Sequence, residues 1–439
     1  MTDTKLVTGL APQLGLRGVV LFGLAYMAPL IVLGTFGIVA ESTDGTVPTA
    51  YLLALVAMLF TAASYGRMAA RYPVAGSAYT YVRKAIDSRV GFLVGWAVLL
   101  DYFFLPMVIW LIGAAYLNAQ FPGVPSWVWL VGFIVVTTVL NVLGIKVAVR
   151  ANFLLMAFQV LVIVFFFVLS LRQVVSDGGS LVSATPFFHG GSSFGTISAG
   201  AALAAYAFLG FDAVTTLTEE TSEPRKTIPR AILLTALIGG VVFVLLAYAT
   251  QLVHPGGVFD DSSSAAFEIA KTIGGTLFGA VFLAGLVVAQ FASGIAAQAG
   301  ASRLMYAMGR DGVLPKRVFA YLHPRLQTPA FGIALVGVVG LVALSLDVST
   351  STSFINFGAF TAFTFVNLSV IALHLRERGP ALTGLVFPAI GALVDVWLLT
   401  NLDGIAVTLG LIWLGLGVVY LAVLTRGFRT APPEIAFEE

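Results

Sequence analysis

Two carboxylates stand inside segments that otherwise read as hydrocarbon. Asp101 interrupts the stretch LLDYFFLPM (residues 99–107), and Asp212 lies in AALAAYAFLGFDAVTTL (residues 201–217). An acid inside an apolar span is costly and usually serves a substrate or ion pathway, so Asp101 predicts a site for positive charge. The alternative is a structural carboxylate, protonated or hydrogen-bonded to a neighbouring helix. Asp395 is a further acid in an apolar segment, and for it we favour the structural role.

Membrane-spanning helices are the elements that must carry these acids. Of the 439 residues, 59% are hydrophobic and 10% charged, and the mean hydropathy is +0.99, unlike a water-soluble domain. Apolar runs of about 20 residues, enough to cross roughly 30 Å of hydrocarbon, recur along the whole chain. We therefore expect an all-α membrane protein with twelve spans, at 18–40, 48–68, 90–118, 125–143, 151–174, 193–217, 230–252, 275–302, 329–347, 353–374, 382–401 and 405–425.

No long polar segment separates these spans, so residues 1–439 are expected to form one integral membrane domain. There is no room for a soluble catalytic part, and no nucleic-acid partner is expected. Counted from the start of the third span, Asp101 lies about 16 Å deep, close to the middle of the bilayer. The lipid bilayer is the environment that this composition demands.

Basic residues between the spans predict the orientation of the chain. With the N-terminus inside, 21 of the 23 lysines and arginines fall in cytoplasmic segments, and only Arg172 and Lys271 fall outside. This asymmetry predicts a multi-pass protein of the cytoplasmic membrane with both termini in the cytoplasm. The N-terminal segment shows no pattern of a removable signal peptide.

Residues for other chemistries are missing or scattered. The chain has no cysteine, which removes disulfides, thiolate metal sites and cysteine nucleophiles. No metal-ligand spacing and no nucleophile triad emerges, so neither a metal, a cofactor nor an enzymatic activity is expected. The four histidines fall in loops or at segment ends: His189, His254, His323 and His374.

Two of the expected spans contain helix-breaking residues. Pro29 lies inside the first span, where it cannot donate a backbone hydrogen bond, so the helix should open near residues 25–30. Gly210 and Asp212 lie at comparable depth in the sixth span. Irregular backbone cannot face lipid, so both breaks must line a cavity or pack against protein.

Breaks at corresponding places in two halves of a chain indicate a transporter with inverted repeats. The alternative is that these glycines and prolines only allow close helix packing. The expected organisation is a first repeat at 18–174, a second at 193–374 and two additional helices at 382–425.

At these residues the sequence resembles the amino acid, polyamine and organocation superfamily of secondary transporters, and within it the bacterial putrescine importers. The resemblance implies a LeuT-like fold of five plus five inverted-repeat helices with helices one and six broken. It also implies alternating access around a central site lined by Asp101 and Tyr102. The matching stretches are GLAYMAPLIVLGTFGIV, SYGRMAARYPVAGSAYTYVRKA, GFLVGWAVLLDYFFLPM, FLGFDAVTTLTEETSEPRKTIPRAI, SRLMYAMGRDGVLP and INFGAFTAFTFVNLSV.

The sequence departs from amino acid carriers of this superfamily in two ways. Those carriers use a glycine- and serine-rich first break, whose free N–H groups receive the substrate carboxylate. Here the break is Met27, Ala28, Pro29, and Pro29 has no N–H to offer. Losing an anion receptor while gaining Asp101 favours amines without a carboxylate. Gln159 stands where several proton-coupled relatives carry a lysine, so that coupling device is in doubt.

We expect Asp101 to hold a primary ammonium together with carbonyl groups freed near the end of the first half-helix. Aromatic side chains are expected along the methylene stem, and Asp212 either binds a second ammonium or braces the broken helix. The expected binding residues are Asp101, Tyr102, Tyr26, Met27, Ala28, Pro29, Tyr206, Phe208, Gly210, Phe211 and Asp212. A cytoplasmic gate of ion pairs is expected among Glu219, Glu220, Arg67 and Arg83, unless this is an ordinary solvated loop.

The favoured hypothesis is a secondary importer of putrescine or a similar small amine. A carrier of cationic or neutral amino acids is the alternative in the same class. A channel and a membrane-embedded enzyme would be different classes of protein. The paired breaks argue against a channel, and the absence of clustered catalytic groups argues against an enzyme. Import would be driven by a coupled proton or by the membrane potential, worth about 2.3 kcal/mol per charge per 100 mV.

Overall fold

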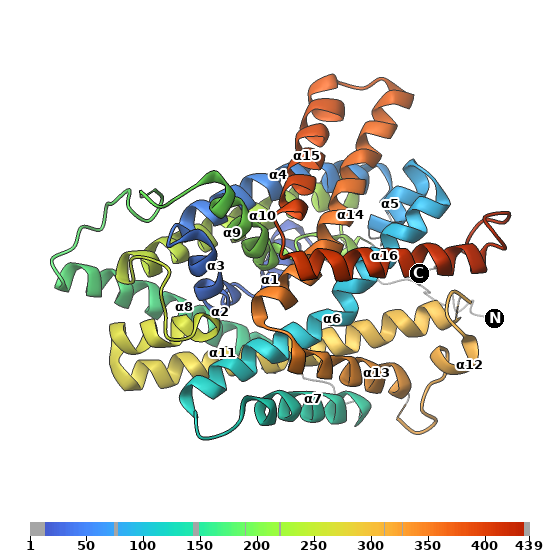
Figure 1. Ribbon diagram of the computed structural model, residues 1–439. Helices are drawn as coiled ribbons and strands as arrows, with labels where there is room; N and C mark the ends of the chain where they lie inside the picture. The colour runs from blue at the N-terminus through green and yellow to red at the C-terminus, as the bar shows by residue number, and fades with distance from the viewer. Residues whose placement is uncertain are drawn as a thin grey trace, which may run out of the picture.

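Helices make up the regular structure of the chain. The computed structural model describes residues 14–73, 78–143, 149–188, 190–218, 221–310, 312–326 and 328–433. Within these ranges, strand-like pairing is confined to one isolated bridge between Leu14 and Thr221. Figure 1 shows the long helices packed side by side, most of them running in the same general direction.

The helices of the first half, up to residue 176, are α1 (Leu16–Met27), α2 (Ile31–Gly34), α3 (Phe36–Thr43), α4 (Val47–Arg71), α5 (Ala78–Ala85), α6 (Ser88–Gln120), α7 (Ser126–Leu143) and α8 (Val149–Ser176). The next four elements are α9 (Phe194–Ala204), the 3-10 helices η1 (Ala205–Phe208) and η2 (Asp212–Leu217), and α10 (Pro224–Val253). The remaining elements are η3 (Ser262–Ser264), α11 (Ala265–Arg310), α12 (Lys316–Phe319), α13 (Ala330–Gly340), η4 (Leu341–Ser345), α14 (Val348–Glu377), η5 (Leu382–Val386), α15 (Phe387–Thr400) and α16 (Gly404–Leu424).

Eleven helical segments of the described chain are long and apolar enough to cross a membrane. They correspond to eleven of the twelve expected spans. The ninth expected span, 329–347, is represented by the shorter apolar segment Ala330–Ser345, in which α13 tightens into η4. The expectation of an all-helical, multi-pass membrane protein is confirmed.

Side-chain caps mark the points at which several long helices begin. The Asp87 carboxylate accepts a hydrogen bond of 2.7 Å from the Arg89 N–H at the start of α6, and Asp347 does the same for Thr350 at the start of α14. Ser193 and Thr196 form a reciprocal capping box at the start of α9. These caps satisfy N–H groups that the first helical turn leaves without partners.

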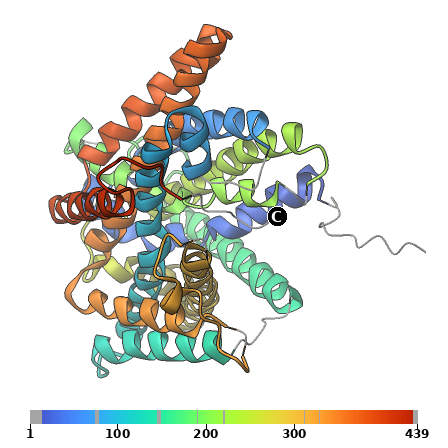
Figure 2. The same cartoon turned by 90° about the vertical axis from the view of Figure 1, so that its right-hand side faces the viewer.

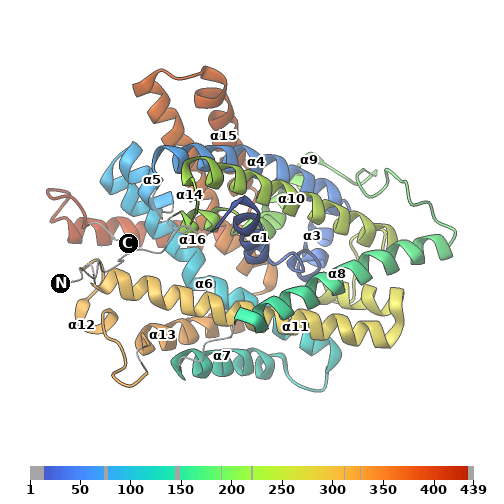
Figure 3. The same cartoon turned by 180° about the vertical axis from the view of Figure 1, so that it is seen from behind.

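The two interrupted helical segments lie in the middle of the bundle. Views from opposite sides place α1 centrally, and α1 packs against both α10 and η2 (Figures 1 and 3). The most extensive helix pair is α4 with α10. There the helices approach so closely that a β-carbon at Gly66 would lie only 3.3 Å from Pro229. Figure 2 shows α16 almost along its axis, while the hairpin of α14 and α15 rises at an angle to it. The bundle thus encloses the broken segments on several sides.

Candidate functional site

A cavity of about 450 Å³ lies where the two interrupted segments meet α6, α8, α11 and α14. This volume is in the range of small-molecule binding sites in proteins. Apolar side chains form most of its wall, and a small set of polar side chains is distributed over it. The polar members are Tyr26, Tyr65, Asp101, Tyr102, Gln159, Tyr206, Asp212, Gln290 and Ser293.

The first interruption follows α1. Ala28 adopts the left-handed conformation with φ 44°, Pro29 follows, and the helix resumes as α2 at Ile31. The break expected near residues 25–30 is therefore confirmed. Among the described residues, no backbone N–H is paired with the carbonyl groups of Tyr26 and Met27. Two acceptor groups with partial negative charge thus lie at the C-terminal end of α1, beside the cavity.

The second interruption separates η1 from η2. Gly210 adopts φ 107°, a conformation that a residue with a β-carbon rarely takes. Asp212 is the first residue of η2, and the backbone N–H groups of Gly210, Asp212 and Ala213 lie close to its carboxylate. The Ala213 N–H also donates to the Gly210 carbonyl at 3.1 Å. Asp212 therefore lies beside the backbone of the broken helix, as the bracing role considered from the sequence requires.

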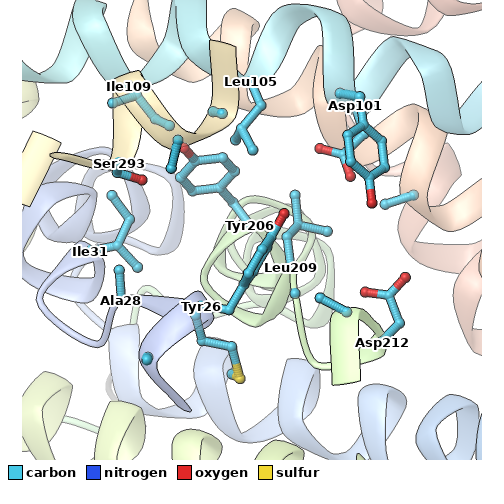
Figure 4. Close-up of a pocket in the computed structure, with 18 of the residues that line it drawn as sticks. Tyr26, Ala28, Ile31, Asp101, Leu105, Ile109, Tyr206, Leu209, Asp212 and Ser293 are labelled. Carbon is cyan, nitrogen blue, oxygen red and sulfur yellow. The ribbon is translucent and has the colours of Figure 1, made fainter. Parts of the chain in front are cut away.

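Asp101 differs from Asp212 in its surroundings. Its Oδ1 atom is buried and has no hydrogen-bond partner within the described part of the chain. The two carboxylates are close enough for electrostatic repulsion, and both lie on the same side of the cavity, opposite Ser293 (Figure 4). No lysine or arginine occurs among the described residues that line the cavity. Its wall therefore carries acids without a basic partner, an arrangement that attracts cations.

Nine of the twelve expected binding and coupling residues line the cavity, and they come from α1, α6, α8, η1, η2 and the two helix breaks. The lining includes Tyr26, Met27, Ala28, Asp101, Tyr102, Gln159, Tyr206, Gly210 and Asp212. Of the expected binding residues, Pro29, Phe208 and Phe211 are not part of this lining.

The two phenylalanines beside the second break pack into the protein core instead. Phe208 is fully buried with its ring edge against Phe243 on α10. Phe211 is fully buried as well and contacts the rings of Tyr65 and Phe363. Neither side chain is placed to touch a molecule in the cavity directly.

The expected gate is placed only in part. Glu219 and Glu220 lie outside the described residues. Arg67, on α4, has its Nη1 atom buried without a hydrogen-bond partner in the described chain, and Arg83 donates to the Tyr79 hydroxyl at 3.3 Å. Neither arginine is part of the cavity lining.

One wall of the cavity was not predicted from the sequence. It is a face of α11 with small side chains spaced three and four residues apart, and Gln290 adds an amide beside it. This spacing places residues on one helical face, so the periodicity of small residues was the available signal. The face consists of Ala289, Ala292, Ser293, Ala296 and Ala297.

Comparison with known proteins agrees with this architecture. Residues 18–402 match the amino acid permease family. The chain is 44% identical to the low-affinity putrescine importer PlaP of Escherichia coli K12 over 97% of this chain and 96% of that protein. It is 26% identical to the branched-chain amino acid permease BcaP of Bacillus subtilis over 86% of this chain and 85% of that protein.

A third relative is the mouse cationic amino acid transporter 4, which is 28% identical over 87% of this chain and 62% of its own length. These relatives are transporters and not enzymes, as the sequence led us to expect. With a family match over most of its length, a bundle of apolar helices and a central cavity beside two helix breaks, this chain is a member of the amino acid permease family of membrane transporters.

Proposed function

We propose that this protein imports putrescine or a similar small diamine across the cytoplasmic membrane. One observation carries the proposal: a cavity of about 450 Å³ contains two carboxylates, and its described lining has no lysine or arginine. Such a site is incomplete without a cation. The printed name of the relative that is 44% identical, a putrescine importer, supports the same substrate class.

Asp101 is the group that binds the first ammonium. Its unpartnered Oδ1 accepts a charge-assisted hydrogen bond, while the Asp212 carboxylate already lies close to backbone N–H groups. The free carbonyl groups of Tyr26 and Met27 complete the coordination of this ammonium. A positive charge here also relieves the repulsion between the two carboxylates.

The rest of the diamine extends toward the opposite wall. Tyr206 lies between the carboxylate side and Ser293 in Figure 4, with Leu105 and Leu209 nearby. These side chains cover the methylene stem. The second ammonium then reaches the neutral oxygens of Ser293 and Gln290, which accept hydrogen bonds without adding charge. An amine lacking this second group loses those contacts.

The transport cycle follows the inverted-repeat scheme. We count Ala330–Ser345 as the ninth of twelve spans, so that the interrupted spans Leu16–Gly34 and Phe194–Leu217 occupy corresponding places in two repeats of five. Alternating access then rocks the repeats around the cavity. Arg67, Arg83, Glu219 and Glu220 form the cytoplasmic gate in this scheme, and the amine enters with a proton or along the membrane potential.

Contacts between the helix ends support the proposed orientation, with both termini in the cytoplasm. The start of the described chain pairs with the segment between η2 and α10 through Leu14 and Thr221. Arg71 forms an ion pair of 2.7 Å with Glu377, joining the ends of α4 and α14. A third contact joins the start of α6 to the segment after α16, through Arg89 and the Phe428 carbonyl. Each of these contacts joins two segments that the charge pattern assigns to the cytoplasmic side.

A carrier of amino acids is the second candidate, because two relatives carry that name. The N–H of Leu30, at the entry to α2, has no backbone acceptor within the described chain and offers one donor for a substrate carboxylate. Asp101 opposes that ligand by charge repulsion. The diamine therefore fits the electrostatics of the cavity better.

Uptake of labelled putrescine into proteoliposomes tests the proposal. Unlabelled putrescine and cadaverine should compete strongly, while arginine and alanine should compete weakly. Strong competition by alanine or arginine, with none by cadaverine, would replace the diamine with an amino acid. Saturable uptake and counterflow separate a carrier from a channel.

A further inference from the structure

A second buried acid lies outside the cavity, between three helices. Asp395 on α15, Thr61 on α4 and Asn367 on α14 are all fully buried. The Thr61 hydroxyl and the Asn367 Nδ2 each donate to Asp395 Oδ2 at 2.9 Å. Asn367 Nδ2 also donates to the Thr61 hydroxyl at 3.0 Å. None of these three side chains belongs to the described lining of the cavity.

Two oxygen atoms of this cluster are left without partners. Asp395 Oδ1 and Asn367 Oδ1 are both buried and accept no hydrogen bond from any described residue. The Asn367 amide has little room to turn away, because a β-carbon at Gly391 would stand only 2.8 Å from its Oδ1 and Nδ2 atoms. Two buried acceptors that lack a donor are costly, and an ionised carboxylate without a cation is costlier still.

The surroundings of Asp395 supply no permanent positive charge. The elements packed against α15 are α4, α9, α14 and η5. Neither α9 nor η5 has a titratable side chain, and α15 itself has only Asp395. The titratable residues of α14 are His374, Arg376 and Glu377, about two turns or more beyond Asn367.

On α4 the titratable side chains are Tyr51, Tyr65, Arg67 and Arg71. Tyr65, one turn from Thr61, lies within electrostatic range of Asp395 and also of Asp212, and its side chain lines the cavity. No ion pair joins Asp395 to a lysine, arginine or histidine in the described chain. Tyr65 thus stands between the buried cluster and the cavity.

We propose that Asp395 is a proton-binding site, with the proton on Oδ1 donating a hydrogen bond to Asn367 Oδ1. A carboxylic acid and a primary amide then pair through two hydrogen bonds, of which the one from Nδ2 to Oδ2 is already present. The proton comes from water, and no other bond forms or breaks. A single proton gives Asn367 Oδ1 the hydrogen-bond donor that it lacks, and it also removes the negative charge of Asp395. A sodium ion would need more oxygen ligands than this cluster offers.

This site joins helices from different parts of the chain. Loss of the proton leaves a buried anion facing the Asn367 oxygen, which favours separation of α15 from α14. Resting on the proposed function, the consequence is that protonation of Asp395 is coupled to the transport cycle. The Tyr65 ring, with edge contacts to Phe211 and Phe363, links this interface to the second helix break.

Infrared spectroscopy of the purified full-length protein tests proton binding without any substrate. Wild-type protein at neutral pH should show a carboxylic acid C=O band that is absent in Asp395→Asn. Asp403→Asn is the matched control, because Asp403 caps the next helix and asparagine also serves as a cap. That variant should keep the band. A wild-type spectrum identical to that of Asp395→Asn would overturn the proposal, as would thermal stabilisation by sodium that Asp395→Asn abolishes.

The transport measurement addresses coupling separately. Putrescine binding should change less than threefold in Asp395→Asn, while stimulation of uptake by an inward proton gradient should be lost. Asp403→Asn should retain the stimulation. Full stimulation in Asp395→Asn would overturn the coupling. Failure of the wild-type protein to bind any diamine, with the infrared band intact, would instead contradict the proposed function and leave the proton site standing.

Discussion

The ring of Tyr26 rests directly on the backbone of Gly210, so the two interruptions of the bundle touch each other. A β-carbon at Gly210 would overlap with this ring, and the backbone there has φ 107°. Tyr26 is the penultimate residue of α1, and its carbonyl is among those freed by the break. Glycine at position 210 therefore sets how closely the two broken segments approach, and with it the shape of the cavity.

Gly210→Ala should destabilise the protein and weaken diamine binding together. The left-handed backbone costs an alanine roughly 1–3 kcal/mol, and the methyl group must also displace the Tyr26 ring. Thermal unfolding in detergent and equilibrium binding are the measurements. Gly300→Ala is the control, since a β-carbon there meets no atom within 4 Å. Equal melting temperatures for Gly210→Ala and wild type would show that the close approach is not required.

Asp101→Asn should abolish putrescine uptake while the protein still inserts and folds. Truncating one partner of a buried charge pair costs about 2–5 kcal/mol, which corresponds to at least about a 30-fold weaker affinity. Asp87→Asn removes an exposed acid that caps the same helix and should bind normally. Binding isotherms for both variants, with a size-exclusion profile for folding, decide the matter. Wild-type affinity in Asp101→Asn would remove the basis of the diamine assignment.

Asp212→Asn should have a milder effect than Asp101→Asn, on the order of tenfold or less in affinity. The asparagine Oδ1 still offers an acceptor to the backbone N–H groups at the second break. Asp212→Ala lacks this acceptor and should also lower the melting temperature. Comparing affinity and melting temperature for the two variants separates bracing from direct binding. A loss in Asp212→Asn as large as that in Asp101→Asn, at unchanged stability, would make Asp212 a direct ligand.

The sequence predicted the helical segments well because a membrane span depends on a local property, its length and apolar composition. It also located the break at Pro29, but proline alone is not a sufficient signal: Pro106 and Pro229 lie inside α6 and α10, which continue through them. What opens the chain at residues 28–30 is the combination of a left-handed residue with a partner segment that receives the freed groups. Which segment packs against the break depends on the tertiary fold, so the local sequence does not reveal it.

The side-chain directions at the second break show the same limit. Tyr206, Gly210 and Asp212 line the cavity, whereas Phe208 and Phe211 point into the core. A change from α to 3-10 geometry between residues 204 and 217 shifts each side chain around the axis. Residue type could not reveal that change. The small-residue face of α11, by contrast, carried a readable helical period.

Cysteine labelling should settle the proposed orientation, because the natural sequence has no cysteine to remove. A cysteine introduced by Val258→Cys lies on a side chain that is 85% exposed, in the connection after α10, and should react with a membrane-impermeant maleimide added to intact cells. Thr430→Cys is also exposed, but it lies beyond α16, in a segment that the charge pattern assigns to the cytoplasmic side. It should react only after the membrane is permeabilised. The charge asymmetry predicts this difference, since basic segments stay on the cytoplasmic side. Labelling of Thr430→Cys in intact cells, with Val258→Cys protected, would invert the topology and place the amine entry on the opposite face.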